Sequence, residues 1–230
     1  MPLTTLDYDL SEDERQIRDT VHRFAAEVLR PAGQALDKLS PDQVIAPDSI
    51  FWRVYKQYQG LGLSDIDPDM DPVALARLRC IISEEMGWGD SGLAISFAAG
   101  GMPAMLAGMS ENPELIEQFS VDELGCWAIT EPGHGSDMID FSDRFLAPGS
   151  QRGAPNCIAR AEGNEFVISG QKSAWVSNGT IARSAALYCA TETADGSKGG
   201  GIFLVPLDVD GISRGQALNK IGQRALNQGE

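Results

Sequence analysis

The residues best suited to chemistry lie in one short stretch, WAITEPGHGSD, at positions 127–137. The stretch begins as a strand-like run, meets Pro132, and then sets His134 between two glycines ahead of a serine and an aspartate. Gly133 and Gly135 permit positive φ angles and let another group approach the main chain, and successive N–H groups in such a turn can bind an anion. The stretch therefore predicts either an anion-binding loop or a strand that ends in a tight turn.

Several other chemistries lack the spacing that they need. The four cysteines are widely separated, with no C-x-x-C pair, and the two histidines are far apart. This pattern gives no support to a zinc site, to any other metal site or to a redox-active dithiol. Cys126 and Cys189 lie in apolar runs, which predicts that they pack in the core. His134, Ser136 and Asp137 lie too close together in sequence to indicate a Ser-His-Asp triad without geometry.

Charge and hydropathy narrow the possible partners. The 230-residue chain has 18 Lys and Arg against 33 Asp and Glu, which gives a formal net charge of -15. Attraction to nucleic-acid phosphates or to anionic membranes is not expected from such a chain. The acidic start MPLTTLDYDLSEDERQ has no basic leader followed by an apolar run, and no stretch comes close to the roughly 20 apolar residues of a membrane span. We therefore expect a cytoplasmic protein that binds no nucleic acid and has no membrane span.

The elements that must position these residues change in type halfway along the chain. Ser11 and Glu14 form a capping box, and apolar residues follow at helical spacing until Pro31 ends the run. Further helical segments follow up to about residue 120, among them one that begins after an Asp-Pro cap at positions 71–72. From about residue 121, strand-length apolar runs alternate with turn residues, which favours an antiparallel barrel or sandwich.

A long irregular segment, Met138 to Ala154, interrupts the second half. It carries Arg144 and Arg152, whose guanidinium groups could bind phosphate, although exposed arginines are common on any surface. A segment of this length between strands is typical either of a functional loop or of a disordered connection. We predict a loop there.

Two motifs together resemble those of a known family. The stretch WAITEPGHGSD at 127–137 and the stretch GQKSAWVSNG at 170–179 follow an all-helical segment, about 40 residues apart. They resemble the T-E-P-x-x-G-S-D loop and the G-x-K-x-W-[IV]-[ST]-N-G hairpin in the middle domain of acyl-CoA dehydrogenases. The resemblance implies an α+β fold of the acyl-CoA dehydrogenase type. In that fold an all-α helical domain, residues 1–120, precedes an incomplete antiparallel β-barrel middle domain, residues 121–230.

The resemblance implies FAD as the cofactor and assigns a set of contacts to it. The cofactor-binding residues that it implies are Trp127, Ile129, Thr130, Gly135, Ser136, Trp175, Val176 and Ser177. Ser136 and His134 would also contact the acyl-CoA substrate. The alternatives that remain open are that Trp175 is a plain barrel-core residue and that His134 is a solvated turn residue.

The activity that the resemblance implies is the oxidation of acyl-CoA to 2,3-enoyl-CoA. A base removes the α-proton while a hydride passes from the β-carbon to flavin N5, and the base is expected beyond Glu230, so the 230-residue chain alone is expected to be inactive. Glu131 is expected to have a structural or capping role. A flavoprotein electron acceptor and a homo-oligomer are also implied. The alternatives are a non-catalytic flavin-binding or acyl-CoA-binding module, an assembly partner, and an acyl-CoA oxidase or flavin monooxygenase of the same superfamily.

Overall fold

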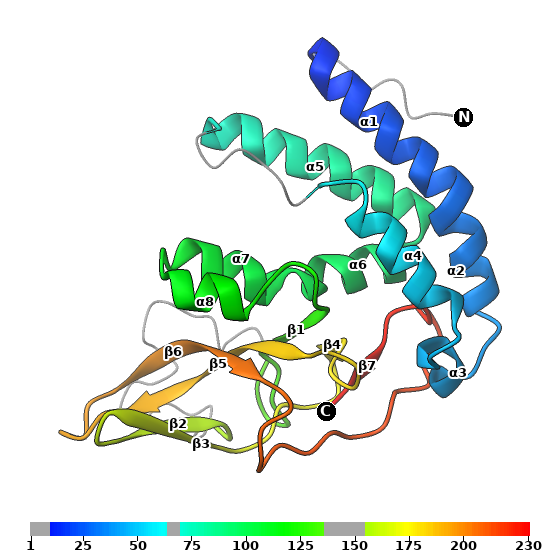
Figure 1. Cartoon of the computed structure of the whole chain (residues 1–230). Helices are drawn as coiled ribbons and strands as arrows, with labels where there is room; N and C mark the ends of the chain where they lie inside the picture. Colours follow the sequence, from blue (N-terminus) through cyan, green and yellow to red (C-terminus); the bar gives the residue numbers. More distant parts are fainter. Residues whose placement is uncertain (1–9, 64–69, 136–154) are drawn as a thin grey trace. The chain divides into compact units, whose positions relative to one another are not determined.

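The computed structural model describes residues 10–63, 70–135 and 155–230. The chain divides into two compact units (Figure 1). Unit 1 comprises residues 1–95 and 220–225, and unit 2 comprises residues 96–219 and 226–230. The expected domain boundary near residue 120 stays a prediction.

Unit 1 is helical, as its apolar periodicity predicts. Its elements are α1 (Glu12–Phe24), η2 (Ala25–Leu29), α2 (Arg30–Leu36), α3 (Pro41–Ile45), α4 (Ile50–Gln59) and α5 (Pro72–Gly89), and α6 (Ser91–Gly100) begins in this unit. The predicted capping box of Ser11 and Glu14 is confirmed, since each side chain accepts a hydrogen bond from the backbone N–H of the other residue. Asp71 caps α5 by accepting from two backbone N–H groups, with Pro72 in the first turn.

Pro31 does not end the first helix, contrary to the prediction. The helical path continues through the π-helical turn η2 into α2, which ends only at Leu36. A proline inside a helix lacks an N–H, and its ring collides with the carbonyl four residues earlier. The wider π turn directly before Pro31 provides a place where the helix can absorb that collision.

Unit 2 carries a seven-stranded sheet beside α7 (Met102–Met109) and α8 (Pro113–Gln118). The strands are β1 (Gly125–Ala128), β2 (Ile158–Glu162), β3 (Glu165–Ser169), β4 (Val176–Ser177), β5 (Ser184–Glu192), β6 (Lys198–Pro206) and β7 (Gln228–Gly229). Their order is β3-β2-β5-β1-β4-β7, with β6 paired to β5 (Figure 1). The predicted fold class, helices followed by a partial barrel, is confirmed. The sheet is mixed rather than antiparallel throughout, because β1 and β2 both pair in parallel with β5.

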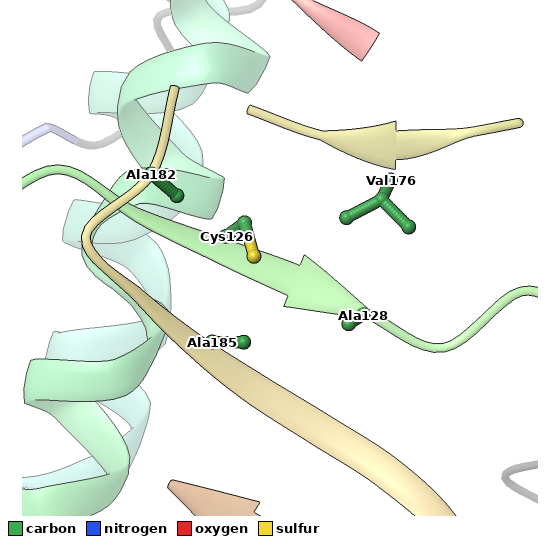
Figure 2. Packing of buried hydrophobic residues seen from close by; sticks show 5 residues of the cluster. All are labelled: Cys126, Ala128, Val176, Ala182 and Ala185. Carbon is green, nitrogen blue, oxygen red and sulfur yellow. The ribbon is translucent and has the colours of Figure 1, made fainter. Parts of the chain in front are cut away.

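The core of unit 2 is built from small side chains. Figure 2 shows its central cluster, which consists of Cys126, Ala128, Val176, Ala182 and Ala185. Each of these side chains is almost fully buried, and the prediction that Cys126 packs in the core is confirmed. The backbone hydrogen bonds of the sheet set the spacing of β1, β4 and β5, and these small side chains fill the space on one side of it.

One apolar stretch corrects an expectation from the sequence. By length and composition, residues Ser91–Met109, with a mean hydropathy of 1.4, could cross a membrane. Of this stretch 44% is buried inside the fold, and Gly101 separates α6 from α7 within it. In unit 2, α7 packs directly on β1, since an added Cβ at Gly125 would lie 2.5 Å from the ring of Pro103. Part of the 91–109 stretch is therefore apolar because it packs in the core.

Candidate functional site

The two motifs predicted to act together lie side by side in unit 2. Trp127 of β1 pairs with Ser177 of β4 in an antiparallel register. The pairing extends beyond the strands, because the N–H of Ser173 donates to the carbonyl of Thr130 at 2.9 Å. Two segments about 40 residues apart in sequence therefore form one continuous strip of backbone.

Both motif tryptophans are exposed. Trp127 is 41% exposed, whereas its neighbours Cys126 and Ala128 are buried on the opposite face of β1. Trp175 is 59% exposed. The alternative that Trp175 is a barrel-core residue is therefore wrong for this structure, and both indoles offer an apolar face to a ligand.

A third aromatic ring belongs to this face of the sheet. The ring centroid of Tyr188, on β5, lies 6.4 Å from that of Trp127. The parallel register sets Trp127 opposite Ala186, and strand alternation then puts Tyr188 on the same face. Sequence reasoning missed Tyr188, because nothing in the sequence indicates that β5 lies beside β1.

A strained turn holds Trp175 outward. Ala174 has a positive φ of 46°, a region that residues with a Cβ rarely adopt. The N–H of Trp175 donates to the carbonyl of Ser173 at 2.6 Å, which closes a three-residue γ-turn around Ala174. Such strain persists only where the surrounding structure over-determines it, and it is frequent at ligand sites.

Ile129 and Thr130 are half-buried at the end of β1. The carbonyl of Ile129 accepts a hydrogen bond from the Nζ of Lys172 at 2.9 Å, and the carbonyl of Thr130 is used by Ser173. Within the described residues the hydroxyl of Thr130 has no hydrogen-bond partner. This hydroxyl is therefore available to a ligand.

Glu131 is a buried structural residue. Its side chain is fully inaccessible and accepts three hydrogen bonds, from the N–H groups of Asn156 (2.6 Å) and Cys157 (3.2 Å) and from the Nζ of Lys172 (2.7 Å). Lys172 is itself only 9% exposed. The pair joins the first motif to the second and to the start of β2, which confirms the expected structural or capping role. A carboxylate with these three donors has no access to a substrate proton.

The glycine stretch forms a tight turn after β1. Glu131 and His134 close a four-residue turn through two mutual backbone hydrogen bonds, of 2.7 and 3.3 Å. Neither Gly133 nor Gly135 uses the positive φ that a glycine permits. An added Cβ at either glycine meets nothing within 4 Å among the described residues. The described residues thus leave the main chain open to a close approach at this turn.

Other predicted site residues are either outside the described ranges or packed in the core. Ser136, Arg144, Arg152 and the Met138–Ala154 loop lie outside the described residues. Val176 packs in the core cluster, which leaves only its backbone for a cofactor (Figure 2).

Asn178 fixes the end of the second motif from within. It is fully buried at a positive φ of 65°, and its side chain bonds to the hydroxyl of Ser96 (2.6 Å), the carbonyl of Ser96 (2.7 Å) and the carbonyl of Gly125 (3.2 Å). These bonds tie β4 to β1 and to the start of unit 2. Asn178 therefore holds the two motifs in register.

Comparison with known proteins identifies relatives of this chain. Residues 126–230 match the family model described as acyl-CoA dehydrogenase, middle domain. Human mitochondrial short-chain specific acyl-CoA dehydrogenase is 29% identical over 227 residues, which cover 94% of this chain and 49% of that protein. Rice mitochondrial isovaleryl-CoA dehydrogenase is 26% identical over 225 residues, covering 93% of this chain and 49% of that protein. The chain thus spans about half the length of these curated relatives.

Solved structures share the fold. A glutaryl-CoA dehydrogenase from Mycobacterium smegmatis aligns with a TM-score of 0.72 at 23% identity, over 99% of this chain and 54% of that one. An acyl-CoA dehydrogenase from Bacillus anthracis, solved in complex with FAD, aligns with a TM-score of 0.69 at 22% identity, over 97% of this chain and 35% of that one.

Proposed function

We propose that the chain belongs to the acyl-CoA dehydrogenase family and that its two motifs hold FAD in an enzyme that oxidises acyl-CoA to 2,3-enoyl-CoA. One observation carries the proposal: the motifs pair with each other while Trp127 and Trp175 remain exposed. Apolar rings left in solvent beside a strained turn are costly unless a ligand covers them. FAD, when bound, supplies the hydride acceptor for the oxidation.

The residues of this strip fit a flavin ring. The two indoles offer stacking faces, and the hydroxyl of Thr130 is free to donate a hydrogen bond. Among the described residues, the Oγ of Ser177 accepts one long hydrogen bond, 3.5 Å, from the Nε2 of Gln228, so its own proton can also be donated to a ligand. Open space at Gly133 would let a ligand approach the main chain. Trp175, Thr130 and Ser177 would thus orient the ring.

Protein groups in this chain position the cofactor rather than move the substrate proton. Glu131 and Lys172 neutralise each other and hold the end of β1, and Asn178 holds the end of β4. The base that removes the α-proton is proposed to lie outside residues 1–230, as the family resemblance implies. His134 and Ser136 remain candidates for contact with acyl-CoA.

FAD binding tests the proposal directly. FAD is titrated into the purified chain, and binding is followed by calorimetry and by the visible flavin absorption. Trp175→Ala and Thr130→Ala should each weaken binding by about 0.5–1.5 kcal/mol, roughly 2- to 13-fold in Kd. Phe166→Ala is the matched control, since Phe166 is also a half-exposed aromatic residue of unit 2 but lies outside the two motifs. Thr130→Ser, which keeps the hydroxyl, should bind like the unaltered chain.

Equal FAD affinity in the unaltered chain and in both alanine variants would contradict the assignment of these contacts. Absence of any FAD binding by the folded chain would contradict the cofactor role of the two motifs. Circular dichroism of each variant separates lost binding from lost folding.

A second experiment concerns the missing base. The chain is mixed with FAD, acyl-CoA of several chain lengths and an artificial electron acceptor, and no turnover is expected because a base must lie within hydrogen-bond reach of the α-proton. Turnover that disappears in Glu131→Gln would overturn the structural assignment of Glu131. Turnover that persists in that variant would show another base within the chain.

The electron acceptor, assembly and location belong to the proposal as well. We propose a flavoprotein acceptor and a homo-oligomer, both as the family resemblance implies. Cytoplasmic location stays a prediction; the curated relatives named above are described as mitochondrial proteins.

A further inference from the structure

Two cysteines far apart in sequence become neighbours in the sheet. Cys157 directly precedes β2, and Cys189 lies in β5, which pairs in parallel with β2. The register sets Ile158 opposite Ala190, so the preceding positions, Cys157 and Cys189, also face each other. The N–H of Ala190 donates to the carbonyl of Cys157 at 3.2 Å, which shows that the pairing extends to this position.

The spacing suits a covalent bond between the two residues. Paired strands lie about 4.8 Å apart, within the Cα separation of about 4.4–6.8 Å that disulfides require. Opposite residues of a parallel pair point to the same face of the sheet, and both cysteines belong to one buried cluster with Ala159. Both are free thiols in this structure.

The two sulfur atoms differ in reactivity. A hydrogen bond from the thiol of Cys189 holds the pKa of Cys157 below its usual range, and the ammonium group of Lys172 favours the same thiolate. The hydrogen bond to Cys157 raises the pKa of Cys189, and burial raises it further. Glu131, the other charged group that faces the pair, opposes ionisation of both thiols. Cys157 is thus the nucleophile of the pair.

Among the described residues, Cys157, which is 4% exposed, borders a cavity with room for a molecule of the size of hydrogen peroxide. The side chain of Cys157 lines this cavity, which has a volume of about 550 Å³ and lies in unit 2, together with Lys172, Leu187 and Cys126. Cys126 also lines this cavity, but it pairs with Ala185, which lies four residues before Cys189 along β5. Burial raises the pKa of Cys126 to about 12, so it provides an inert thiol in the same cavity.

We propose that Cys157 and Cys189 form a dithiol that hydrogen peroxide converts to a disulfide. The thiolate of Cys157 attacks one oxygen of the peroxide, the O–O bond breaks, and Cys157 becomes a sulfenic acid as hydroxide takes up a proton and leaves as water. The sulfur of Cys189 then attacks the sulfenic sulfur, the S–O bond breaks, and a second water leaves with the proton of Cys189. The two sulfurs together lose two electrons, and the peroxide gains them.

Hydrogen bonds of Glu131 would connect this disulfide to the candidate site. The disulfide would fix β2 to β5 at the residue whose N–H donates to the carboxylate of Glu131. Glu131 in turn holds the end of β1 through Lys172. The proposal stands without the assigned function, because it rests only on the strand register, the cavity and the thiols.

Peroxide treatment of the 230-residue chain tests the proposal. After treatment, remaining thiols are blocked with N-ethylmaleimide, and peptides are mapped without reduction. The expected result is a loss of about 2 Da, two hydrogen atoms, from the intact chain before blocking, and after blocking a linked peptide pair that contains Cys157 and Cys189. Cys126→Ser is the matched control and should form the same link at the same rate.

Cys189→Ser separates the two chemical steps. A serine keeps a hydroxyl donor beside Cys157 but offers no second sulfur, so Cys157 should accumulate as a sulfenic acid that dimedone traps. Exposed Cys80 reports whether peroxide was active in every sample. Oxidation of Cys80 with no link between Cys157 and Cys189 in the unaltered chain would overturn the proposal, as would an equal loss of 2 Da in Cys157→Ser. Because the link is measured in the unaltered chain, the test does not depend on either variant folding.

Discussion

Replacing Lys172 by methionine should strongly destabilise unit 2. The substitution keeps an unbranched side chain of similar length but removes the ammonium group that lies 2.7 Å from the carboxylate of Glu131. At that distance, and with an effective dielectric constant of about 20, the attraction between two unit charges is roughly 6 kcal/mol. The cost of burying both charges offsets part of this attraction. We expect the variant to lose about 3–5 kcal/mol of unfolding free energy, because the carboxylate stays buried without its cation.

Urea unfolding followed by circular dichroism measures the effect. With a denaturant slope of about 1–3 kcal/mol per M, the expected loss corresponds to a midpoint that falls by about 1–2 M or more. Hydrogen exchange provides a local readout, since the N–H groups of Asn156 and Cys157 donate to the same carboxylate and should lose protection. The double variant Glu131→Gln with Lys172→Met should recover part of the loss, because no unpaired charge is then buried.

An exposed ion pair on the same sheet serves as the control. Arg160 and Glu192 lie 3.4 Å apart with side chains 50% and 38% exposed, so Arg160→Met should cost only about 0–1 kcal/mol. If Lys172→Met cost no more than this control, the reasoning would be refuted: the Glu131–Lys172 pair would be solvated, and the structural role assigned to Glu131 would be wrong.

Three further predictions concern other contacts. Asn178→Ala should lower the thermal midpoint and cost at least about 1–3 kcal/mol, because buried partners lose their hydrogen bonds. Gly125→Ala should cost about 1–3 kcal/mol, since its Cβ would lie 2.8 Å from a backbone carbonyl, whereas Gly133→Ala should change the urea midpoint little. The hydrogen bond from Arg77, together with that from the backbone of Ser11, lowers the pKa of Glu14 from 4.5 to about 2, so these contacts should stabilise the fold above pH 4.5 and lose their effect as the pH falls towards 2. An NMR titration of Glu14 with and without Arg77→Ala would check the last prediction.

The helices could be predicted because their signals are local. A capping box lies within four residues, so Ser11 and Glu14 are sufficient to locate the start of α1 without knowledge of the rest of the fold. Pro31 misled the prediction for the opposite reason. The π turn that accommodates it depends on how the helix packs, and no residue type in Ala25–Leu29 announces it.

The pairing of the strands could not be predicted in the same way. Strand-length apolar runs indicate β1 and β5, but they do not indicate β2, nor that β5 pairs in parallel with both β1 and β2 along one edge. This arrangement brings Tyr188 beside Trp127 and Cys157 beside Cys189. C-x-x-C spacing was therefore a poor guide to these cysteines, because the register between strands, rather than the distance along the chain, makes them neighbours.

The two motifs contain residues of two kinds, and the structure separates them. The polar residues Glu131, Lys172 and Asn178 are buried and satisfy each other or the backbone, whereas Trp127 and Trp175 lie in solvent. In a folded chain without a ligand, the cheaper arrangement would bury the indoles and expose the charges. The reverse arrangement is explained if the buried polar groups hold two backbone segments rigidly and the exposed rings meet a partner outside the chain. That division of roles makes Glu131 part of the scaffold rather than a group that could reach a ligand.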